Sequence, residues 1–354
     1  MIYLESPYTD PAFNLALEEY AFQRLDRQEE YFMLWRNDRS VVIGKHQNAR
    51  EEVNLPYAKR HGIPVVRRLS GGGAVYHDPG NLNVTWIVDG KETEWSMERF
   101  ARPILLACRE FGIEAEIQGR NDLVVGGRKF SGNAGYRENG RIMHHGTVMI
   151  AVDKETMARV LRVDAGKIAS NGVPSVQSRV VNLSECTDAS LTVETFAHVL
   201  RRKVLGTDKP DLRGWAAAEL EEVRALAARR YGAWEWNYGS FPGYTLEQSY
   251  RVEGCGTVTV GMDVRAGVIE ALSVRGDFLG DGPIETLEAA LTGCRLERQE
   301  LVEILDQLPV KRYVYGTSSG VMADILCGVA PERISPDAQS MGNRRVEYVR
   351  EGGD

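Results

Sequence analysis

The sequence RRLSGGGAVYH at residues 67–77, which follows a short apolar run, is the segment around which the rest of the chain can be interpreted. Three successive glycines after a strand let the backbone approach a ligand closely and turn N–H groups inward, an arrangement suited to phosphate or carboxylate. The two arginines beside them can add charge-assisted hydrogen bonds to the same anion. A glycine run between strands is also common as a plain turn, so an anion site and a turn both remain open.

Strand and helix patterns alternate on both sides of this segment. Asp10 is a good helix N-cap, Pro11 suits the first turn, and apolar residues then recur at helical spacing. Strand-like runs occupy 31–35, 41–43, 64–67, 83–88, 122–125 and 147–152, and helices are predicted at 96–112, 156–163 and 192–205. No GxGxxG follows a strand and opens a helix. The pattern therefore predicts an α/β (α+β) fold with mixed sheets flanked by helices, not a doubly wound sheet.

A second unit is predicted toward the C-terminus. Residues 250–264 alternate across glycines and 268–274 add a further strand, which together predict a β-meander. Helical patterns follow at 283–291 and 297–305. The predicted division is a large domain at 1–245, a small α+β domain at 246–329, and a weakly ordered tail at 330–354, where Pro, Gly, Ser and charge are frequent.

Composition narrows the class of protein. The 354 residues are 43% hydrophobic and carry a formal net charge of -7, so a sizeable core is expected and a nucleic-acid partner is disfavoured. No run approaches the roughly 20 apolar residues of a membrane span, and the N-terminus lacks the pattern of a signal peptide. Five cysteines are scattered singly, as in a reducing compartment. A cytoplasmic location without membrane attachment is predicted.

A second chemical segment joins GRNDL, residues 119–123, to RKFSGNA, residues 128–134. Asp122 is a candidate ligand for Mg²⁺, which usually takes only one or two protein carboxylates. Lys129 is a compact cation that can bridge a carboxylate and a phosphate while they react. The glycines around it suggest a loop that closes over a ligand.

Two further segments carry weaker signals. His144 and His145 are adjacent on a predicted strand and should therefore face opposite sides of the sheet. Residues 167–183 form a long polar connection, and long connections often act as lids or binding loops. The chain has neither a GxSxG elbow nor a GxxxxGK[ST] loop, so any ATP site uses another architecture.

Taken together, the motifs resemble lipoate–protein ligase A, a family of the lipoyl/biotin protein ligase superfamily. The matching strings are RRLSGGGAVYHDPGNLN (67–83), GRNDLVVGGRKFSGNAGYRENGRIMHHGTVMI (119–150) and KIASNGVPSVQSRVVNLSE (167–185). DPAFNLALEEY, FMLWRNDRSVVIGKHQN, WEWNYGSFPGY and DVRAGVIEALSVRGDFLG also resemble that family. The resemblance covers about residues 1–327 and leaves the tail unexplained.

The resemblance implies a large catalytic domain of the biotin/lipoyl-ligase fold followed by a small accessory domain. It also implies an ATP-dependent, AMP-forming ligase that uses Mg²⁺. Lipoate and ATP would give lipoyl-AMP, and the lysine of a lipoyl domain or of the glycine-cleavage H protein would then displace AMP. Residues 175–182 match the loop expected to cover the adenylate.

Site residues are implied by the same resemblance. Lys129 matches the catalytic lysine that touches both the lipoate carboxyl and the phosphate. Positions matching the nucleotide site are Arg68, Gly73, Ala74, Val75, Tyr76, Asn121, Asp122 and Lys129, with Asp122 also at the metal position. Positions matching the lipoate pocket are Leu17, Trp35, Ser70, Gly72, His77, Lys129, His145 and Gly146.

Two alternatives remain. An octanoyl or lipoyl transferase of the same fold works through a thioester and needs a reactive cysteine in the pocket. No cysteine lies between Cys108 and Cys186, the region that holds Lys129, which favours the ligase. A non-catalytic lipoate-binding protein would keep the pocket and lose the chemistry, but Lys129 and Asp122 are both present. The acceptor protein, the choice between lipoate and octanoate, and the oligomeric state are not predicted.

Overall fold

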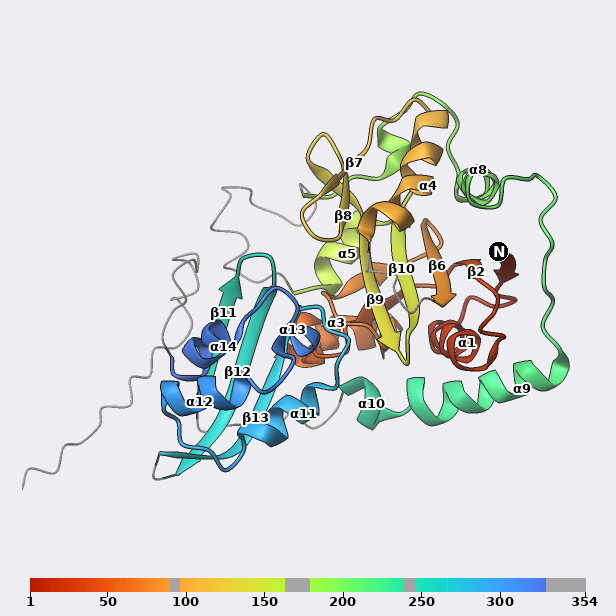
Figure 1. Ribbon diagram of the computed structural model, residues 1–354. Helices are drawn as coiled ribbons and strands as arrows, with labels where there is room; N and C mark the ends of the chain where they lie inside the picture. Colours follow the sequence, from red (N-terminus) through yellow and green to blue (C-terminus); the bar gives the residue numbers. More distant parts are fainter. Residues whose placement is uncertain (90–95, 163–178, 239–245, 266, 329–354) are drawn as a thin grey trace, which may run out of the picture.

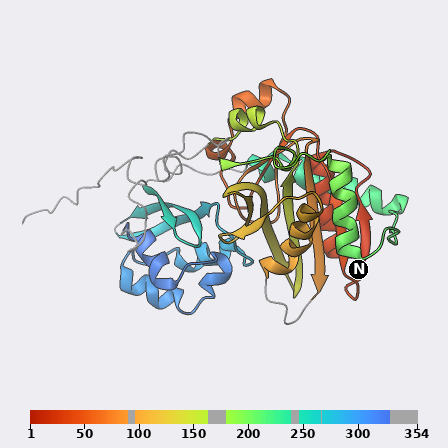
Figure 2. The same ribbon diagram turned by 90° about the horizontal axis from the view of Figure 1, so that it is seen from above.

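The computed structural model describes residues 1–89, 96–162, 179–238, 246–265 and 267–328. Figure 1 and the view from above in Figure 2 show two lobes side by side. The larger lobe holds the N-terminal strands and helices, and the smaller one holds three strands and the last helices. None of the described helices is long and apolar enough to cross a membrane.

The larger lobe is built on two mixed sheets. Seven strands lie in the order β1 (Ile2–Glu5), β2 (Tyr31–Trp35), β6 (Asn81–Asp89), β10 (Arg141–Met149), β9 (Arg128–Glu138), β8 (Asp122–Val125) and β7 (Glu116–Gln118). β1 runs parallel to β2 and the other neighbours are antiparallel. A second sheet has the order β4 (Val65–Arg67), β3 (Ser40–Ile43) and β5 (Val75–His77).

Helices cover both faces of the large sheet. Those of this lobe are α1 (Pro11–Arg24), α2 (Ala49–Glu52), α3 (Leu55–Arg60), α4 (Met97–Glu110), α5 (Lys154–Val160), η1 (Leu183–Glu185), α8 (Val193–Leu205), α9 (Ala217–Leu226), the π-helical turn η2 (Ala227–Tyr231) and α10 (Trp234–Tyr238). α4 and α8 pack on one face through a core that includes Phe100 and Phe196. α1 and the small sheet face the other side, where the core includes Leu17 and Met33.

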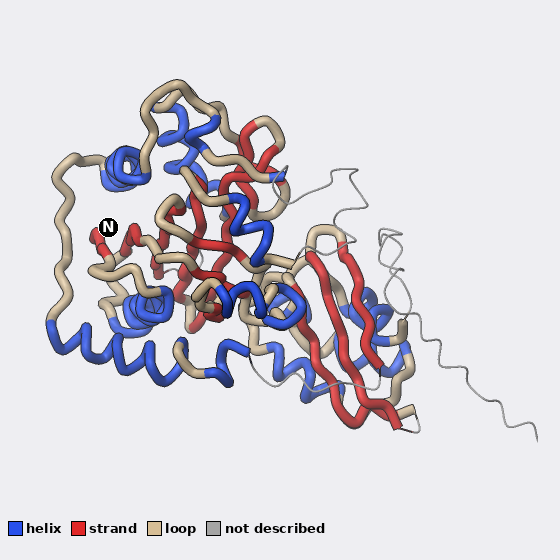
Figure 3. Tube along the Cα trace, turned by 180° about the vertical axis from the view of Figure 1, so that it is seen from behind, coloured by secondary structure: helices blue, strands red, loops and turns tan. Residues whose placement is uncertain are grey.

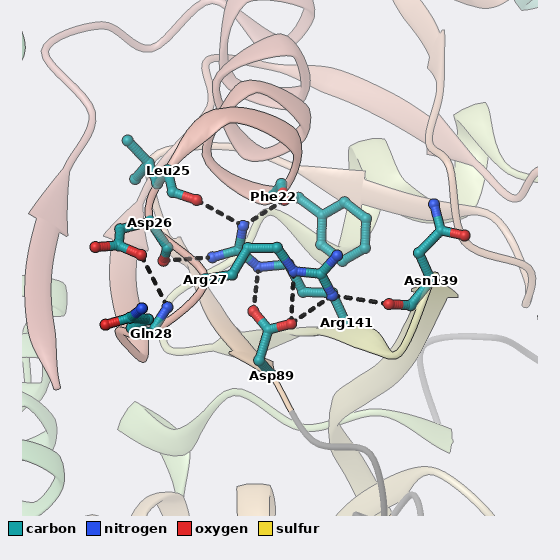
Figure 4. Close-up of polar contacts among 8 residues, drawn as sticks. All are labelled: Phe22, Leu25, Asp26, Arg27, Gln28, Asp89, Asn139 and Arg141. Atoms are coloured by element: carbon teal, nitrogen blue, oxygen red, sulfur yellow. Dashed lines mark hydrogen bonds and ion pairs between the residues drawn. The ribbon is translucent and has the colours of Figure 1, made fainter.

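Helix α1 is fixed at both ends, which matters because it borders the site. The Asp10 side chain accepts a hydrogen bond from the Phe13 N–H, and Pro11 occupies the first turn, as predicted. At the other end the buried Arg141 guanidinium donates to the carbonyl oxygens of Phe22 and Leu25 at 2.8 and 2.9 Å (Figure 4). Arg141 also pairs with Asp89 on the neighbouring strand β6. The helix is therefore tied directly to the large sheet.

The smaller lobe is an antiparallel meander with helices on it. Its strands are β11 (Leu246–Val252), β12 (Gly256–Arg265) and β13 (Val268–Gly276), and its helices are α11 (Ile284–Leu291), α12 (Arg298–Leu305), α13 (Val310–Tyr313) and α14 (Ser319–Leu326). Seen from behind in Figure 3, its strands form a sheet separate from those of the larger lobe. It has an apolar core of its own. We call this lobe the accessory unit.

Most predicted elements are confirmed, and with them the mixed α/β fold. The expected loop at 128–134 is wrong, because these residues open the long strand β9, which pairs with β8 after a turn at Gly126 and Gly127. The strand expected at 147–152 instead runs from Arg141 to Met149. Helix α9 was not predicted. Most of the connection at 167–183 and the whole tail at 330–354 lie outside the described residues, and the proposed domain boundaries adjoin such segments, so that division stays a prediction.

Candidate active site

A cavity lies where the two sheets of the larger lobe face each other across the glycine run. It is partly open to solvent, and the empty space among its lining residues, open solvent included, amounts to about 580 Å³. The residues lining it are Leu15, Trp35, Val42, Arg68, Gly72, Gly73, Ala74, Val75, His77, Asn83, Asn121, Lys129, Gly132, Asn133, Ala134, His145, Gly146 and Thr147. Residues from four distant parts of the sequence are thus brought together.

The floor of the cavity crosses the large sheet from strand to strand. Trp35 of β2 is paired with Asn83 of β6, and Asn83 is paired with Thr147 of β10. The Thr147 hydroxyl accepts a hydrogen bond from the Gly132 N–H of β9 at 3.2 Å. Adjacent strands lie about 5 Å apart, so this row spans about 14 Å from β9 to β2. An elongated ligand can therefore lie across the strands.

The β9 end of this row is charged. Lys129 Nζ lies 2.7 Å from Asp122 Oδ1, and both side chains are more than one-third exposed, at 38% and 36%. A Cβ added to Gly132 would lie 2.9 Å from Lys129 Nζ, so the glycine leaves room for the lysine head. Asn121 is held beside them, because its side-chain N–H donates to the Asn133 carbonyl at 2.7 Å. We call this region the charged end.

Arg68 organises the glycine run, which also lines the cavity. Its guanidinium is buried and donates to the carbonyl oxygens of Gly71 and Gly73 at 2.7 and 2.9 Å, and to the Ser70 hydroxyl at 3.0 Å. Burial lowers the pKa of Arg68 to about 10, so it stays charged at neutral pH. Gly72 has φ +90°, which only glycine adopts without strain. The run is therefore a shaped loop and not a plain turn.

The accessory unit also holds this loop. The Gly72 N–H donates to the Phe278 carbonyl at 3.0 Å, so this one amide of the run is already used in the structure. A Cβ on Gly71 would lie 2.4 Å from the same oxygen. The Phe278 ring stacks on His46 of the larger lobe, with centroids 4.9 Å apart. Close packing against the accessory unit thus explains part of the glycine requirement.

The other end of the row, beside Trp35, is apolar and buried, with Leu15 and Val42 on its walls. We call it the apolar end. A chain of hydrogen bonds runs beside it: the Ser70 hydroxyl lies 2.6 Å from His145 Nε2, and His145 Nδ1 lies 3.1 Å from Glu18 of α1. Glu18 also accepts from the Thr85 hydroxyl at 2.5 Å. Both ring nitrogens of His145 are therefore occupied.

His144 and His145 face opposite sides of the sheet, as predicted. The buried His144 ring stacks on Phe100 of α4, with centroids 4.3 Å apart, and contacts Asn133 Oδ1 through Nε2 at 3.0 Å. Burial lowers its pKa well below the usual value, so the ring is neutral. His144 is thus a core residue, and of these two adjacent histidines His145 is the one that lines the cavity.

Most of the predicted site residues line the cavity, and a few do not. Those lining the cavity are Trp35, Arg68, Gly72, Gly73, Ala74, Val75, His77, Asn121, Lys129, His145 and Gly146. Leu17 is buried in the core behind them. Tyr76 faces away because strand residues alternate, and packs with Val41 and Val65. Ser70 and Asp122 are not among the lining residues, but each contacts one of them: Ser70 is hydrogen-bonded to His145, and Asp122 is paired with Lys129.

Sequence reasoning missed several lining residues, of which Leu15, Asn83 and Thr147 are examples. Asn83 had a usable signal, because polar side chains alternate with apolar ones along Asn81–Asp89. Such alternation marks one face of a strand as lining something polar. Leu15 had no such signal, because the apolar helical pattern that contains it also contains Leu17, and the pattern does not tell which of the two lines a cavity.

Comparison with known proteins finds a family match in each lobe. The family model for the lipoyl protein ligase A/B catalytic domain matches residues 10–205, and the model for the bacterial lipoate protein ligase C-terminus matches residues 241–326. The fold and site therefore define a catalytic domain of the lipoyl ligase class with a bacterial-type C-terminal domain.

Individual relatives extend over most of the chain. It is 40% identical over 308 residues to lipoate–protein ligase LplJ of Bacillus subtilis, covering 86% of this chain and 93% of the relative. It is 39% identical over 306 residues to lipoate–protein ligase 1 of Staphylococcus aureus, with the same shares covered. The chain belongs to the lipoate–protein ligase family.

Two solved structures also resemble this chain over nearly their whole length. The lipoate complex of LipL1 from P. falciparum matches with a TM-score of 0.77 and 25% identity, covering 92% of this chain and 98% of that one. A lipoate–protein ligase A bound with ATP matches with a TM-score of 0.56 and 28% identity, covering 67% of this chain and 97% of the other.

Proposed function

We propose that this protein is an ATP-dependent lipoate–protein ligase that forms lipoyl-AMP and transfers the lipoyl group to a lysine of an acceptor protein. The observation that carries the proposal is the cavity, which joins a charged end at Lys129 to an apolar end at Trp35. A molecule with one carboxylate and a long apolar tail fits such a site. Related structures were solved with lipoate and with ATP, which supports both substrates.

The first step would be attack of a lipoate carboxylate oxygen on the α-phosphorus of ATP, with loss of pyrophosphate. Lys129 would hold the carboxylate and the α-phosphate together and stabilise the charge that develops between them. The Arg68-bound glycine loop and Asn121 would position the nucleotide. The row of strands behind Lys129 would orient the acyl chain.

Asp122 fits a role at a magnesium ion, because Mg²⁺ bound with ATP usually takes one or two protein carboxylates and Asp122 lies beside Lys129. The ion would neutralise phosphate charge. Asp122 itself would keep Lys129 oriented toward the reacting groups. No cluster of three or more potential metal-binding side chains occurs in the described ranges.

The second step would be attack of the acceptor lysine amine on the lipoyl carbonyl carbon, with AMP as the leaving group. A lipoyl domain is a suitable acceptor, since a related structure from Thermoplasma acidophilum concerns a bipartite ligase and its E2 lipoyl domain. The glycine-cleavage H protein is the other proposed acceptor. We place the reaction in the cytoplasm, in keeping with five cysteines that form no disulfide.

A thioester-forming transferase is the second candidate. It needs a nucleophilic thiolate at the acyl chain. Among the described residues, those lining the cavity include no cysteine. Burial raises the pKa of Cys108 to about 12 and also raises the pKa of Cys186, so neither thiol is activated. The ligase is therefore favoured.

The test is pyrophosphate release from ATP with lipoate, with and without a purified lipoyl domain, followed by the mass of the acceptor. Lipoate-dependent pyrophosphate and an acceptor heavier by one lipoyl group are expected. Transfer from a preloaded acyl carrier without any adenylate would instead identify a transferase.

A further inference from the structure

His145 and His77 both line the cavity, but they differ in how many of their ring nitrogens are hydrogen-bonded. His145 has partners at both ring nitrogens, as described above. His77, on β5 opposite the sheet floor, has a partner at Nδ1, which lies 3.0 Å from Asn37 Nδ2. Within the described part of the chain, the buried His77 Nε2 has no hydrogen-bond partner. A buried polar atom without a partner is costly unless a ligand or a water completes it.

The hydrogen-bond network fixes which proton His77 carries. The Asn14 side-chain NH₂ donates to the Arg36 carbonyl at 2.9 Å, which sets the orientation of that amide. The same NH₂ donates to Asn37 Oδ1 at 2.8 Å, so the other Asn37 atom facing His77 must be its NH₂. His77 Nδ1 therefore accepts, and in the neutral ring the proton sits on Nε2. The open position is a donor.

This donor lies toward the apolar end. The His77 ring meets the Trp35 ring edge-on, with centroids 6.2 Å apart, and Trp35 ends the row that begins about 14 Å away at β9. Asn83, next to Trp35 on the floor, likewise has an amide atom without a partner among the residues described: Oδ1 accepts from Asn81, and Nδ2 is unmet. A ligand whose carboxylate meets Lys129 would present its tail, not its carboxylate, to His77.

We propose that His77 is a specificity-determining residue, whose Nε2–H donates to a sulfur of the dithiolane ring and so selects a lipoyl tail over a purely hydrocarbon one. The inference rests on the proposed function and extends it to the choice of acyl chain. Sulfur is a weak acceptor that hydrogen-bonds at longer distances than oxygen, while a methylene cannot accept at all. A hydrocarbon tail would bury the Nε2–H and leave it unmet.

The test compares lipoate with 5-cyclopentylpentanoate, in which two ring carbons replace the sulfurs and the shape is otherwise similar. Octanoate serves as an acyclic third acid. Binding is measured by calorimetry without ATP, so the result does not depend on adenylation. We expect the wild-type protein to bind lipoate about tenfold more tightly than the cyclopentyl acid, a modest preference because the acceptor is weak.

Two variants assign the preference to His77. His77→Leu removes the donor and should make lipoate and the cyclopentyl acid bind equally. His77→Gln places an amide N–H near the position of Nε2 and should keep most of the preference. Imidazole ¹⁵N NMR of the wild-type protein should show the Nε2–H form. Equal binding of both acids by the wild-type protein, or an Nδ1–H form, would overturn the inference even if His77→Leu fails to fold.

The inference and the proposed function can fail separately. A binding preference for lipoate without pyrophosphate release would refute the ligase and leave the role of His77 intact. Pyrophosphate release at equal kcat/KM with lipoate and the cyclopentyl acid would support the ligase and refute the role of His77.

Discussion

The two ends of the cavity are built in opposite ways. At the charged end, Lys129 and Asp122 are partly exposed and joined by a single ion pair. At the apolar end, His77 and Asn14 are buried; His77 is hydrogen-bonded to the Asn37 side chain, and Asn14 donates both to Asn37 and to the main-chain carbonyl of Arg36. A half-exposed lysine keeps enough freedom to follow a phosphate, whereas a buried network holds one geometry. The difference indicates that the geometry of the apolar end is fixed on folding, while the charged end stays adjustable.

The largest expected effect comes from removing the charged head of the adjustable end. Lys129→Ala should lower the rate of lipoyl-AMP formation about a thousandfold, because the charge developing between carboxylate and phosphate loses its stabilising partner. The free energy of unfolding should change by less than about 1 kcal/mol, since an exposed ion pair contributes little. The measurement is single-turnover adenylate formation together with urea unfolding.

Lys154→Ala is the matched control for Lys129→Ala. Lys154 also pairs with a carboxylate, Glu185, at 2.7 Å, but lies on α5 away from the cavity. It should leave adenylate formation unchanged. Normal lipoyl-AMP synthesis by Lys129→Ala would remove Lys129 from the mechanism.

At the apolar end, where Glu18 anchors the buried chain of hydrogen bonds, a substitution is expected to lower the stability of the protein more than Lys129→Ala does. Glu18→Ala should destabilise the protein by about 3 kcal/mol, because it leaves His145 and Thr85 without their buried partner. Glu18→Gln should cost clearly less, since its amide oxygen can still accept. Urea unfolding measures both, with the exposed Glu221→Ala as control. Equal, small effects of all three changes would show that this end is not rigidly held.

Local patterns predicted much of this molecule, and the failures share a cause. Asp10 and Pro11 predict the start of α1, because capping depends only on neighbouring residues. The position of Lys129 in a strand depends on pairing with β8, and its glycine-rich surroundings pointed to a loop. The buried network from Asn14 to His77 joins residues 63 positions apart through tertiary packing. No local pattern contains that information.

The same limit applies to the glycine run. The sequence left open whether residues 71–73 and their arginines form an anion loop or a plain turn, and the structure shows a loop shaped by Arg68. It did not predict that Phe278, some two hundred positions away, would bind Gly72. That contact depends on how the accessory unit packs against the larger lobe.

A smaller effect should appear in the pH dependence of stability. Burial, and next the charge of Arg68, lower the pKa of His77 to about 3, whereas the unfolded chain has a value of about 6.5. Between these values the unfolded state binds more protons, so stability is lost as the pH falls through this window. From pH 7 to pH 5, His77 should account for about 2 kcal/mol of lost stability. His77→Gln removes that share, as urea unfolding at both pH values would show.

His61→Gln is the control for the pH experiment, because His61 is exposed in the folded protein whereas His77 is buried. It should leave the loss of stability between pH 7 and pH 5 almost unchanged. An unaltered loss in His77→Gln would mean that His77 takes up its proton in the folded protein, and that the apolar end is less closed than its hydrogen bonds indicate.

The smallest effect separates charge from shape in the glycine run. Arg68→Lys keeps the positive charge, but its single nitrogen cannot replace the guanidinium, which bonds the carbonyls of Gly71 and Gly73 through Nη2 and the Ser70 hydroxyl through Nε. A loosened loop should raise the KM for ATP about tenfold, equivalent to about 1.4 kcal/mol, while the KM for lipoate changes much less. Initial-rate kinetics with each substrate varied in turn measure the two constants. A larger rise in the KM for lipoate would place Arg68 with the acyl chain, because the nucleotide would then not depend on the shape of the loop.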